Sequence, residues 1–556
     1  MRQRALSLGF CIWLVTWMGF IPARATAQRA PSQRASTQQS TTISISSGAE
    51  SVADLLRRGR LLEVERRWSE ALTHYEDALR LYPEEDSLQR RFSHTRLHYG
   101  VGRRYADRSY QSLLSKLGFG EALDLYVQVL LKIQAHYVGA PSWKELVEHG
   151  TNNFEVALAE PEFLQRNLPQ EARSTVDAFR HELRRLLGSR VIGSHSDARD
   201  AVSTAAGLAQ QRLGVPPTAV VLEYLCGATH ALDQYSAYLT PDQLAEVYAQ
   251  IEGNFVGLGI ELKAVEDGLL IVRAIRGSPA EQEGILAGDH VLAVDGHSTK
   301  DLSTDQAANL LQGEAGSVVE LTVAGADRQP RHVSVRRRRV EVPSVDDVKI
   351  VDRVHGIAYL RLACFQKTTC RDLDDALWKL HRQGMKSLII DLRGNPGGLL
   401  VAAVEVVDKF VQHGIIVSTR GRGVQEDFTY VAHSAGTWRV PLVVLIDEDS
   451  ASAAEIFAGA IRDHGRGTIV GQRSYGKGSV QGIFPLSIGN TGVRLTTAKF
   501  YSPAGRPYCH VGVQPDVSVH LAARPADEAA TEFLTPGDDG MLAAAVQAAQ
   551  RPRQPR

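Results

Sequence analysis

Two short segments of the chain carry residue types that together can break a peptide bond. Ser452 stands among small residues in "SASAAEIF" (450–457), at the expected start of a helix. Lys477 stands between two glycines in "SYGKGSVQ" (474–481). Burial away from water lowers the pKa of a lysine by up to about 3–5 units, because desolvation disfavours the charged form. A neutral amine of that kind can take the proton of a serine hydroxyl and make the oxygen a nucleophile.

The Ser452 segment alone does not separate a nucleophile from an ordinary helix N-cap, a position that serine often fills. Lys477 favours the nucleophile, because a lysine between glycines in a strand-like segment has no evident role in stability. Gln481 follows four residues later, on the same face of a strand or a helix. Its neutral amide can hold the amine, whereas a carboxylate there would stabilise the ammonium form. We expect Ser452 as nucleophile, Lys477 as base and Gln481 as the residue that orients it.

A histidine base is the alternative to the lysine. His464 follows Ser452 by twelve residues, which is about 18 Å along a helix axis, and it would point away from the serine. The histidines show no H-E-x-x-H pattern, so we expect neither a metal-dependent peptidase nor any other metal or cofactor.

The elements that must position these segments follow an α/β pattern from Gly356 onward. The predicted strands "GIAYLRL", "KSLIIDL" and "VPLVVLID" alternate with predicted helices, one of them over 369–383. This alternation predicts a largely parallel sheet, and sites gather at the carboxyl ends of such strands. Ser452 lies at one such end. The glycine turn "DLRGNPGG" (391–398) lies at another, where exposed N–H groups suit a developing negative charge.

Short β-runs broken by glycines cover residues 255–338 and resemble a PDZ domain. By that resemblance Gly257, Leu258, Gly259 and Ile260 form the turn whose amides hold a peptide's terminal carboxylate, and a helix over 307–311 lines the side-chain pocket. The peptide would add to the sheet as an extra strand. A PDZ fold that binds nothing is the alternative. The arginine run 336–339 is interpreted as the solvated end of a strand.

The segment from Val52 to Pro83 has the spacing of one tetratricopeptide repeat, with Gly59, Ala71, Tyr75 and Ala78 as its small and packing positions. A lone helical hairpin needs neighbouring helices to cover it. Two interpretations stay open, namely a surface that docks a protein partner and a plain structural pair of helices. Further helical periodicity over 122–158 and 173–187 predicts a scaffold.

The first residues have the features of an export signal. Arg2 and Arg4 precede an apolar stretch over 5–20, and Ala25-Thr26-Ala27 is a small-residue cleavage site. We therefore expect an exported protein, periplasmic or otherwise extracytoplasmic. An uncleaved anchor that keeps it at the membrane is the alternative.

Composition and cysteine content exclude or leave open several other functions. The chain holds 62 Lys plus Arg against 63 Asp plus Glu, so no net positive field indicates nucleic-acid binding. Residues 28–50 are nearly free of apolar side chains and are expected to be a disordered linker. Cys364 and Cys370 could bridge in an oxidising compartment, and buried free thiols are the alternative.

These motifs, in this order, resemble the carboxy-terminal processing peptidases, also called tail-specific proteases. That family's serine motif is present as 450–455 and its lysine segment as 476–481. The glycine motif is present as 391–398, and "ALDQYSAYLTPDQL" (231–244), "LTTAKFYSPAGRPY" (495–508) and "GVQPD" (512–516) match its flanking segments.

The resemblance implies that Ser452 and not Ser450 is the nucleophile, with Lys477 as base and Gln481 as its support. It also implies that the amides of Gly398 and Ala453 hold the oxyanion. Ala454 replaces the family's third serine, 160–217 resembles an insertion, and the tetratricopeptide-like hairpin is not a general feature of the family.

We predict a multidomain α+β protein with an N-terminal helical region, a β-rich PDZ domain and an α/β serine peptidase core. The expected parts are a signal peptide (1–27), a linker (28–50), helices with the hairpin (51–120), helices with the insertion (121–253), the PDZ domain (254–339), the core (340–520) and a C-terminal segment with a disordered basic tail (521–556).

The predicted function is that of an exported endopeptidase that takes unstructured protein C-termini through its PDZ domain and cleaves them through an acyl-enzyme. A protein partner for the hairpin and an oligomer are left open. Membrane contact is expected only through an uncleaved signal segment. The alternative function is a catalytically silent cell-envelope scaffold that binds protein C-termini.

Overall fold

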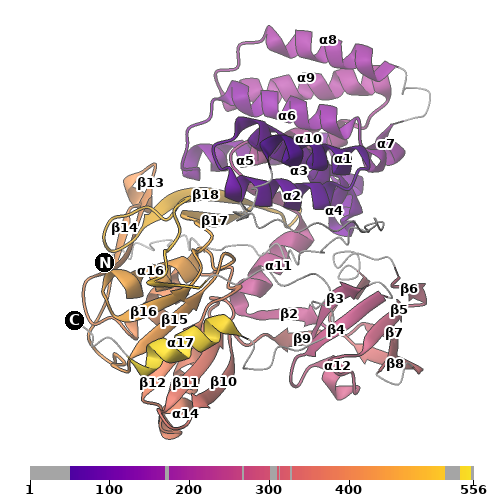
Figure 1. The fold of residues 1–556 in the computed structure, drawn as a ribbon. Coiled ribbons are helices and arrows are strands. Elements are labelled where there is room, and N and C mark those ends of the chain that lie inside the picture. The colour runs from indigo at the N-terminus through magenta and orange to yellow at the C-terminus, as the bar shows by residue number, and fades with distance from the viewer. Residues whose placement is uncertain are drawn as a thin grey trace, which may run out of the picture.

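The structure is a computed structural model that describes residues 51–168, 175–265, 268–300, 310–311, 313–325, 329–519 and 539–551. The expected signal segment, the linker, most of the C-terminal segment and part of the expected PDZ pocket helix lie outside the described residues. A helical region, a PDZ-like part and an α/β core are distinct in the ribbon (Figure 1). Within the described part, every helix is too short or too polar to cross a membrane.

The N-terminal region is built from helices that pack in two apolar clusters. Their bounds are α1 Val52–Val64, α2 Trp68–Leu81, α3 Asp86–Ala106, α4 Arg108–Lys116, α5 Phe119–His136, α6 Trp143–Ala157, α7 Pro161–Asn167, α8 Val176–Gly188, α9 His195–Leu213 and α10 Pro217–His230. The small cluster is formed by α1, α2 and the start of α3, and the large one by the helices that follow. The strand β1 (Ala237–Leu239) and helix α11 (Pro241–Glu252) then lead to the next part.

The hairpin of α1 and α2 packs as the tetratricopeptide spacing predicts. Ala71, Tyr75 and Ala78 are buried on one face of α2. Gly59 of α1 allows the close approach, because a Cβ there would lie 2.2 Å from Cζ of Tyr75. Leu88 of α3 joins the same apolar cluster, so α3 covers the hairpin.

The PDZ-like part has its own apolar core. Its elements are β2 Asn254–Gly257, β3 Ile260–Val265, β4 Gly268–Ala274, α12 Pro279–Gln282, β5 His290–Val294, β6 His297–Ser298, β7 Val318–Ala324, β8 Pro330–Arg336 and β9 Arg338–Glu341. The sheet runs in the order β3-β4-β5-β7-β8, and β2 pairs separately with β9.

The arginine run between β8 and β9 corrects one expectation. Arg337 is buried, and its guanidinium donates hydrogen bonds to the carbonyl oxygens of Leu310, Leu311 and Val318. The prediction that the whole run is a solvated strand end is therefore wrong at Arg337. A guanidinium can be buried where several carbonyl oxygens accept hydrogen bonds from its N–H groups. The other three arginines of the run are exposed.

The α/β core contains the predicted parallel sheet, in the order β10-β11-β12-β15-β16-β19. Only the β10–β11 pair in this sheet of the described chain is antiparallel. The elements are β10 Val345–Asp352, β11 Ile357–Leu362, α14 Thr369–Arg382, β12 Ser387–Asp391, α15 Leu400–Asp408, β15 Leu442–Ile446, α16 Ala453–Asp463, β16 Gly467–Gly471, β19 Val517–Ser518 and α17 Gly540–Gln550.

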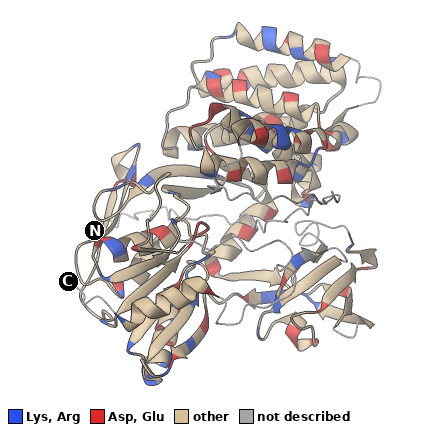
Figure 2. Cartoon of the chain, viewed as in Figure 1, with Lys and Arg blue, Asp and Glu red and all other residues tan. Residues whose placement is uncertain are grey.

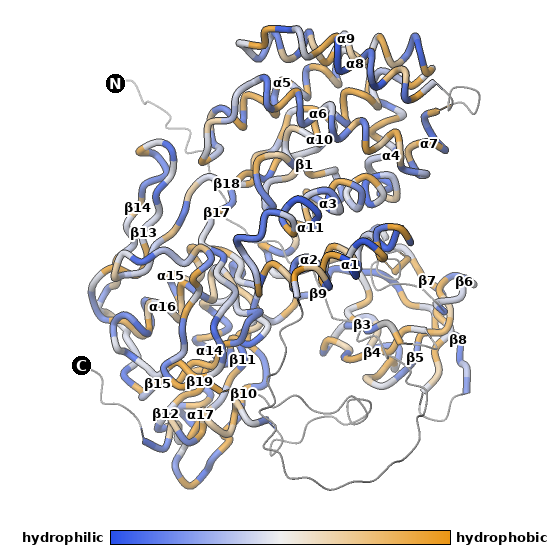
Figure 3. The backbone as a smooth tube through the Cα atoms, turned by 45° about the horizontal axis from the view of Figure 1, so that its top comes forward, coloured by the Kyte–Doolittle hydropathy of each residue, from blue (hydrophilic) through white to orange (hydrophobic). Residues whose placement is uncertain are grey.

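Helices cover both faces of this sheet, which explains why its central strands are apolar throughout. In β12 and β15 every residue is buried. Alternate residues of β12, such as Leu388 and Ile390, join the cluster with α14, α15 and α16, while Ile389 joins the cluster with α17. Much of these strands and of α17 is coloured as hydrophobic in Figure 3. Charges of both signs are spread over all three parts (Figure 2).

A second sheet connects the core with the helical region. Strands β13 Ile415–Gly421, β14 Phe428–Val431, β17 Ser479–Pro485 and β18 Gly492–Tyr501 belong to it, together with β1. Phe484, Leu486, Val493 and Leu495 of this sheet and of the turn after β17 lie in the same apolar cluster as α5 and α10. The segment after Lys477 is therefore held between the helices and the core.

Candidate active site

Ser452 lies immediately before α16, at the carboxyl end of β15, as the sequence predicts. Its side chain is 4 % exposed. Its backbone has φ 54° and ψ −109°, a region that costs a non-glycine residue about 1–3 kcal/mol. Such strain persists only where the surroundings impose it, and it sets the direction of the side chain at the strand-to-helix turn. Ser452 is therefore a tightly positioned residue and not a relaxed cap.

Glu455 joins the serine segment to the lysine segment. One carboxylate oxygen, Oε2, accepts the N–H groups of Ser452 and Lys477, each at 2.8 Å. The other, Oε1, accepts the hydroxyl of Ser474 at 2.6 Å and the N–H of Gly476 at 2.7 Å. Burial raises the pKa of this carboxyl, against the four donors that lower it. The backbones of Ser452 and Lys477 thus meet at a single oxygen atom.

Glu455 has no predicted role of its own. The one sequence feature that points to Glu455 is its place as the last residue of the 450–455 motif. Its partners Ser474 and Gly476 lie about twenty positions away, so only the folded chain identifies it as the link.

Lys477 is 5 % exposed and lies in an irregular stretch, two residues before β17 begins. Its amine is 4.4 Å from the centre of the Tyr235 ring. In the described part of the chain the amine makes no hydrogen bond and no ion pair. Burial lowers its pKa to about 7, and the charge of Arg494 acts in the same direction against Asp233 and Glu455. The amine can therefore be neutral at neutral pH.

Tyr235 is the second residue that sequence reasoning missed. It belongs to the approach segment 231–244, which matched the family motif without a stated role. Its carbonyl accepts the Arg494 Nε–H at 2.7 Å, and its hydroxyl accepts the Gln234 amide at 2.6 Å. The ring is thus fixed from both ends beneath the lysine.

Gln481 lies in β17, but no hydrogen bond joins it to Lys477. Its amide nitrogen donates to Ser479 Oγ at 2.9 Å and to Thr496 Oγ1 at 3.4 Å. A register shift between Val480 and Gln481 interrupts the pairing with β18, so the simple same-face argument does not hold here. Its buried Oε1 has no hydrogen-bond partner and remains able to accept a hydrogen bond from an amine N–H. The orienting role stays a prediction.

The glycine turn lies against the serine segment. Asn395 connects them, because its carbonyl accepts the Ala451 N–H at 2.9 Å while its side chain binds Leu362 O at 2.6 Å and the Gly397 N–H at 2.8 Å. Gly397 has φ 101°, and a Cβ there would lie 2.9 Å from Cβ of Ser452. Only glycine allows this contact between the two loops.

Two backbone N–H groups beside Ser452 have no acceptor among the described residues. One belongs to Ala453, the first residue of α16, where no intrahelical partner exists. The other belongs to Gly398. Phe365 exchanges backbone hydrogen bonds with Gly397 and Leu399 on either side, at 2.8 and 2.7 Å, and leaves the Gly398 N–H out. Both groups remain available to an incoming oxygen atom.

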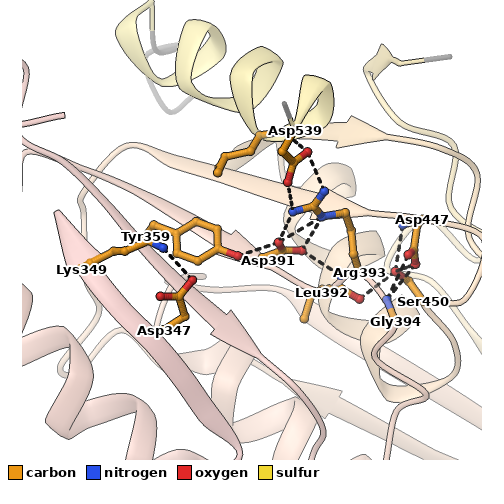
Figure 4. A network of polar contacts seen from close by, with 11 residues as sticks. Asp347, Lys349, Tyr359, Asp391, Leu392, Arg393, Gly394, Asp447, Ser450 and Asp539 are labelled. Atoms are coloured by element: carbon orange, nitrogen blue, oxygen red, sulfur yellow. Dashed lines mark hydrogen bonds and ion pairs between the residues drawn. The ribbon is translucent and has the colours of Figure 1, made fainter. Parts of the chain in front are cut away.

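A network of charged and polar groups connects these loops with the end of β12 and the start of α17 (Figure 4). Arg393 donates hydrogen bonds to Asp391 at the end of β12 and to Asp539 at the start of α17. Asp447 accepts the Gly394 N–H at 3.0 Å. The Ser450 hydroxyl donates to the carbonyl of Leu392 at 2.8 Å. Ser450 is therefore engaged in structure, unlike Ser452.

The histidine alternative receives no support. His464 lies at the far end of α16, where its Nε2 is 2.7 Å from the carbonyl oxygen of Ile415. Asp463 accepts hydrogen bonds from the Ala504 N–H and the Arg506 guanidinium, so it braces the segment after β18. Cys364 and Cys370 are free thiols in this structure.

The expected carboxylate turn of the PDZ-like part lies between two strands. Gly257 ends β2 opposite Arg338, and Ile260 begins β3 opposite Ala274. Leu258 and Gly259 form the connection, with Gly259 at φ 77°. In the described residues β3 is the edge of its sheet, so one side of it is open to an added strand.

Comparisons with known proteins agree with this architecture. The model of peptidase family S41 matches residues 356–519, and that of the PDZ domain matches residues 270–325. A carboxy-terminal-processing protease of Bartonella bacilliformis is 38% identical over 301 residues, which are 53% of this chain and 68% of the relative. A carboxyl-terminal-processing protease of Synechocystis sp. is 34% identical over 321 residues, 55% of this chain and 74% of the relative.

The chain belongs to the carboxy-terminal-processing protease family. Among solved structures, the photosystem II D1 C-terminal processing protease is similar at 26% identity, with a TM-score of 0.39, over 72% of this chain and 92% of that protein. Membership in the carboxy-terminal-processing protease family makes the chain a serine-type endopeptidase. The predicted fold class, a helical region with a PDZ domain and an α/β peptidase core, is confirmed.

Proposed function

We propose that this peptidase removes or trims the carboxyl-terminal tails of unstructured proteins with a Ser452–Lys477 pair. The observation that carries the proposal is a buried lysine, with a pKa lowered to about 7, whose backbone shares a carboxylate oxygen with that of a strained serine. A base with a pKa near the working pH is the most effective one.

In the first half of the reaction, Ser452 Oγ attacks the carbonyl carbon of the scissile bond while Lys477 Nζ takes the hydroxyl proton. The new oxyanion lies between the N–H groups of Gly398 and Ala453, which have no other acceptor. Each such donor is worth about 10²–10³ in rate. Lys477 then gives the proton to the leaving amine, and the acyl-enzyme remains on Ser452.

In the second half, Lys477 takes a proton from water, which attacks the ester carbon. The tetrahedral intermediate collapses, the proton returns to Ser452 Oγ, and the new carboxyl terminus leaves. Gln481 supports Lys477 in this scheme through its unpaired Oε1. No cofactor or metal takes part.

Recognition of the substrate falls to the PDZ domain. We assign the tail to the open edge of β3, with its terminal carboxylate at the turn formed by Gly257, Leu258, Gly259 and Ile260. Backbone pairing of this kind suits a tail without structure, because it depends little on side chains.

The reaction is tested with an unfolded reporter protein that ends in apolar residues. Cleavage by the native enzyme is expected, together with its loss in Ser452→Ala and Lys477→Ala. Ser450→Ala is the matched control, since its hydroxyl binds Leu392 O and not the substrate. Equal cleavage by Lys477→Ala would exclude the lysine mechanism. No cleavage by the native chain would instead favour the silent scaffold.

We also propose that the protein acts outside the cytoplasm after removal of residues 1–27. The amino-terminal features of the sequence support this location. Terminal sequencing of the mature protein from its native host should then begin at Gln28, and an intact Met1 would contradict cleavage.

A further inference from the structure

Helix α2 of the N-terminal hairpin contacts the two loops that carry the candidate catalytic pair. Glu76 and Arg80 lie one helical turn apart on α2, so their side chains share a face. The Tyr475 hydroxyl donates a hydrogen bond to Glu76 Oε1 at 3.0 Å. Tyr475 lies two residues before Lys477. The hairpin thus reaches the lysine loop directly.

The same two helix residues also reach the serine loop. The Arg80 guanidinium lies 5.3 Å from the centre of the Tyr475 ring and 3.6 Å from a carboxylate oxygen of Asp449. Asp449 lies three residues before Ser452. The Tyr475 N–H in turn donates to the carbonyl of Ser450 at 3.0 Å. Glu76, Arg80 and Tyr475 therefore form one connection between the hairpin and both loops.

The opposite side of α2 is already used for packing. Ala71, Tyr75 and Ala78 are buried against α1 and α3. In the ribbon α2 lies on the side of the helical region that faces the peptidase core (Figure 1), and Glu76 and Arg80 contact Tyr475 and Asp449 of that core. The hairpin is therefore docked on its own chain.

We propose that Glu76 and Arg80 are positioning residues for the reaction, which act through Tyr475 to hold the serine and lysine loops in register. This inference rests on the proposed Ser452–Lys477 chemistry and adds to it the role of the hairpin. The hydrogen bond from a partly buried tyrosine to a carboxylate is the stronger contact, because charged acceptors make the stronger hydrogen bonds. The Arg80–Asp449 ion pair is exposed and contributes less.

The test compares α2 variants on the reporter substrate. Glu76→Ala with Arg80→Ala removes both contacts, and alanine keeps the helix intact because it has the best helix propensity. We expect kcat to fall by about tenfold or more, with KM changed by less than about twofold, since small misplacements of reacting groups are costly in rate. Asp77→Ala, an exposed acid on the same helix, is the matched control and should leave kcat unchanged.

Two further measurements separate positioning from a loss of fold. Glu76→Gln keeps an acceptor for the Tyr475 hydroxyl and should restore most of the kcat lost in Glu76→Ala. In the double variant the acidic limb of the kcat–pH profile should move to higher pH. A loosened loop admits water to Lys477, and water stabilises the ammonium form and so raises the pKa of the amine. The charged groups that act on Lys477, namely Arg494, Asp233 and Glu455, are unchanged in these variants.

Should the double variant fail to fold, Tyr475→Phe takes its place, because it deletes only the hydroxyl that binds Glu76. The inference is overturned by an unchanged kcat or by an effect on KM alone. A rise in kcat would also overturn it, because the hairpin would then hinder the reaction. Cleavage by Ser452→Ala would overturn the proposed function itself. If Ser452→Ala is inactive while the α2 variants are fully active, only the role of the hairpin is overturned.

Discussion

The amine of Lys477 lies over the ring of Tyr235, 4.4 Å from its centre. This contact has two opposite effects on the amine. The ring face attracts the ammonium form, which is worth about 2 kcal/mol in a dry site. The ring is also part of the burial that lowers the pKa from 10.5 to about 7, and this lowering corresponds to about 5 kcal/mol. Exclusion of water is the larger effect.

Replacement of Tyr235 should therefore impair the base. We expect Tyr235→Ala to move the acidic limb of the kcat/KM–pH profile to higher pH by about one unit or more, because water then solvates the ammonium form of Lys477. At pH 7 the rate falls by about fivefold or more, since fewer molecules carry a neutral amine. Tyr235→Phe keeps the ring and is the control, with a profile close to that of the native enzyme. A downward shift in Tyr235→Ala would show that attraction by the ring dominates.

The buried lysine should also make stability depend on pH. Its folded pKa, about 7, is below its unfolded value near 10.5, so the unfolded chain binds more protons between these values and stability rises with pH there. Below pH 7 the full cost, about 5 kcal/mol, is present. Lys477→Met, similar in shape and never charged, should therefore melt at a higher temperature than the native chain at pH 6.

At pH 10 the advantage of Lys477→Met should be small, because the native amine is then already neutral in the fold. Thermal melting of both chains at the two pH values measures the difference. Lys379→Met, at an exposed position on α14, is the control and should show no pH-dependent gain. An equal gain at both pH values would mean that packing, not charge, is responsible.

Local patterns predict the candidate nucleophile and base because each depends on near neighbours. Small residues and a helical period around Ser452 indicate a strand-to-helix turn, and glycines beside Lys477 indicate a close approach. Glu455 and Tyr235 escape such patterns, since their partners come from distant segments. The bulge before Gln481 escapes as well, because a register shift depends on the neighbouring strand.

The same distinction explains the misinterpreted arginine run. Alternation along 332–340 predicts a strand end, which β8 and β9 confirm. The burial of Arg337 depends on carbonyls of Leu310 and Val318 that no local pattern reveals. The docking of α2 through Glu76 and Arg80 is likewise a property of the folded chain.

Glu455→Gln should uncouple the two loops. The amide keeps one acceptor oxygen, while its NH₂ group faces donors that the carboxylate had accepted, so at least one buried N–H loses its partner. We expect a loss of about 2–3 kcal/mol in stability and a fall in kcat of about 100-fold. Glu405→Gln, exposed on α15, is the control and should change little. Native kcat in Glu455→Gln would contradict the coupling.

Gly397→Ala should damage the oxyanion site. The new Cβ would lie 2.8 Å from the carbonyl oxygen of Ala451 and 2.9 Å from the N atom of Ala453, and φ 101° suits no side chain. The glycine turn must move away from α16, so the N–H groups of Gly398 and Ala453 no longer converge. We expect kcat to fall by about 10²–10³ with KM little changed, which steady-state kinetics on the reporter can measure.

Gly394→Ala in the same turn is the matched control for this experiment. Its φ of 66° is also positive, but the nearest atom to its Cβ is Nη2 of Arg361 at 4.0 Å, so the change adds strain without a clash. A left-handed alanine costs about 1–2 kcal/mol, which affects stability more than rate. We expect kcat to stay within about threefold of native, because the N–H to Asp447 is kept. Equal losses in both variants would mean that the turn acts only through stability.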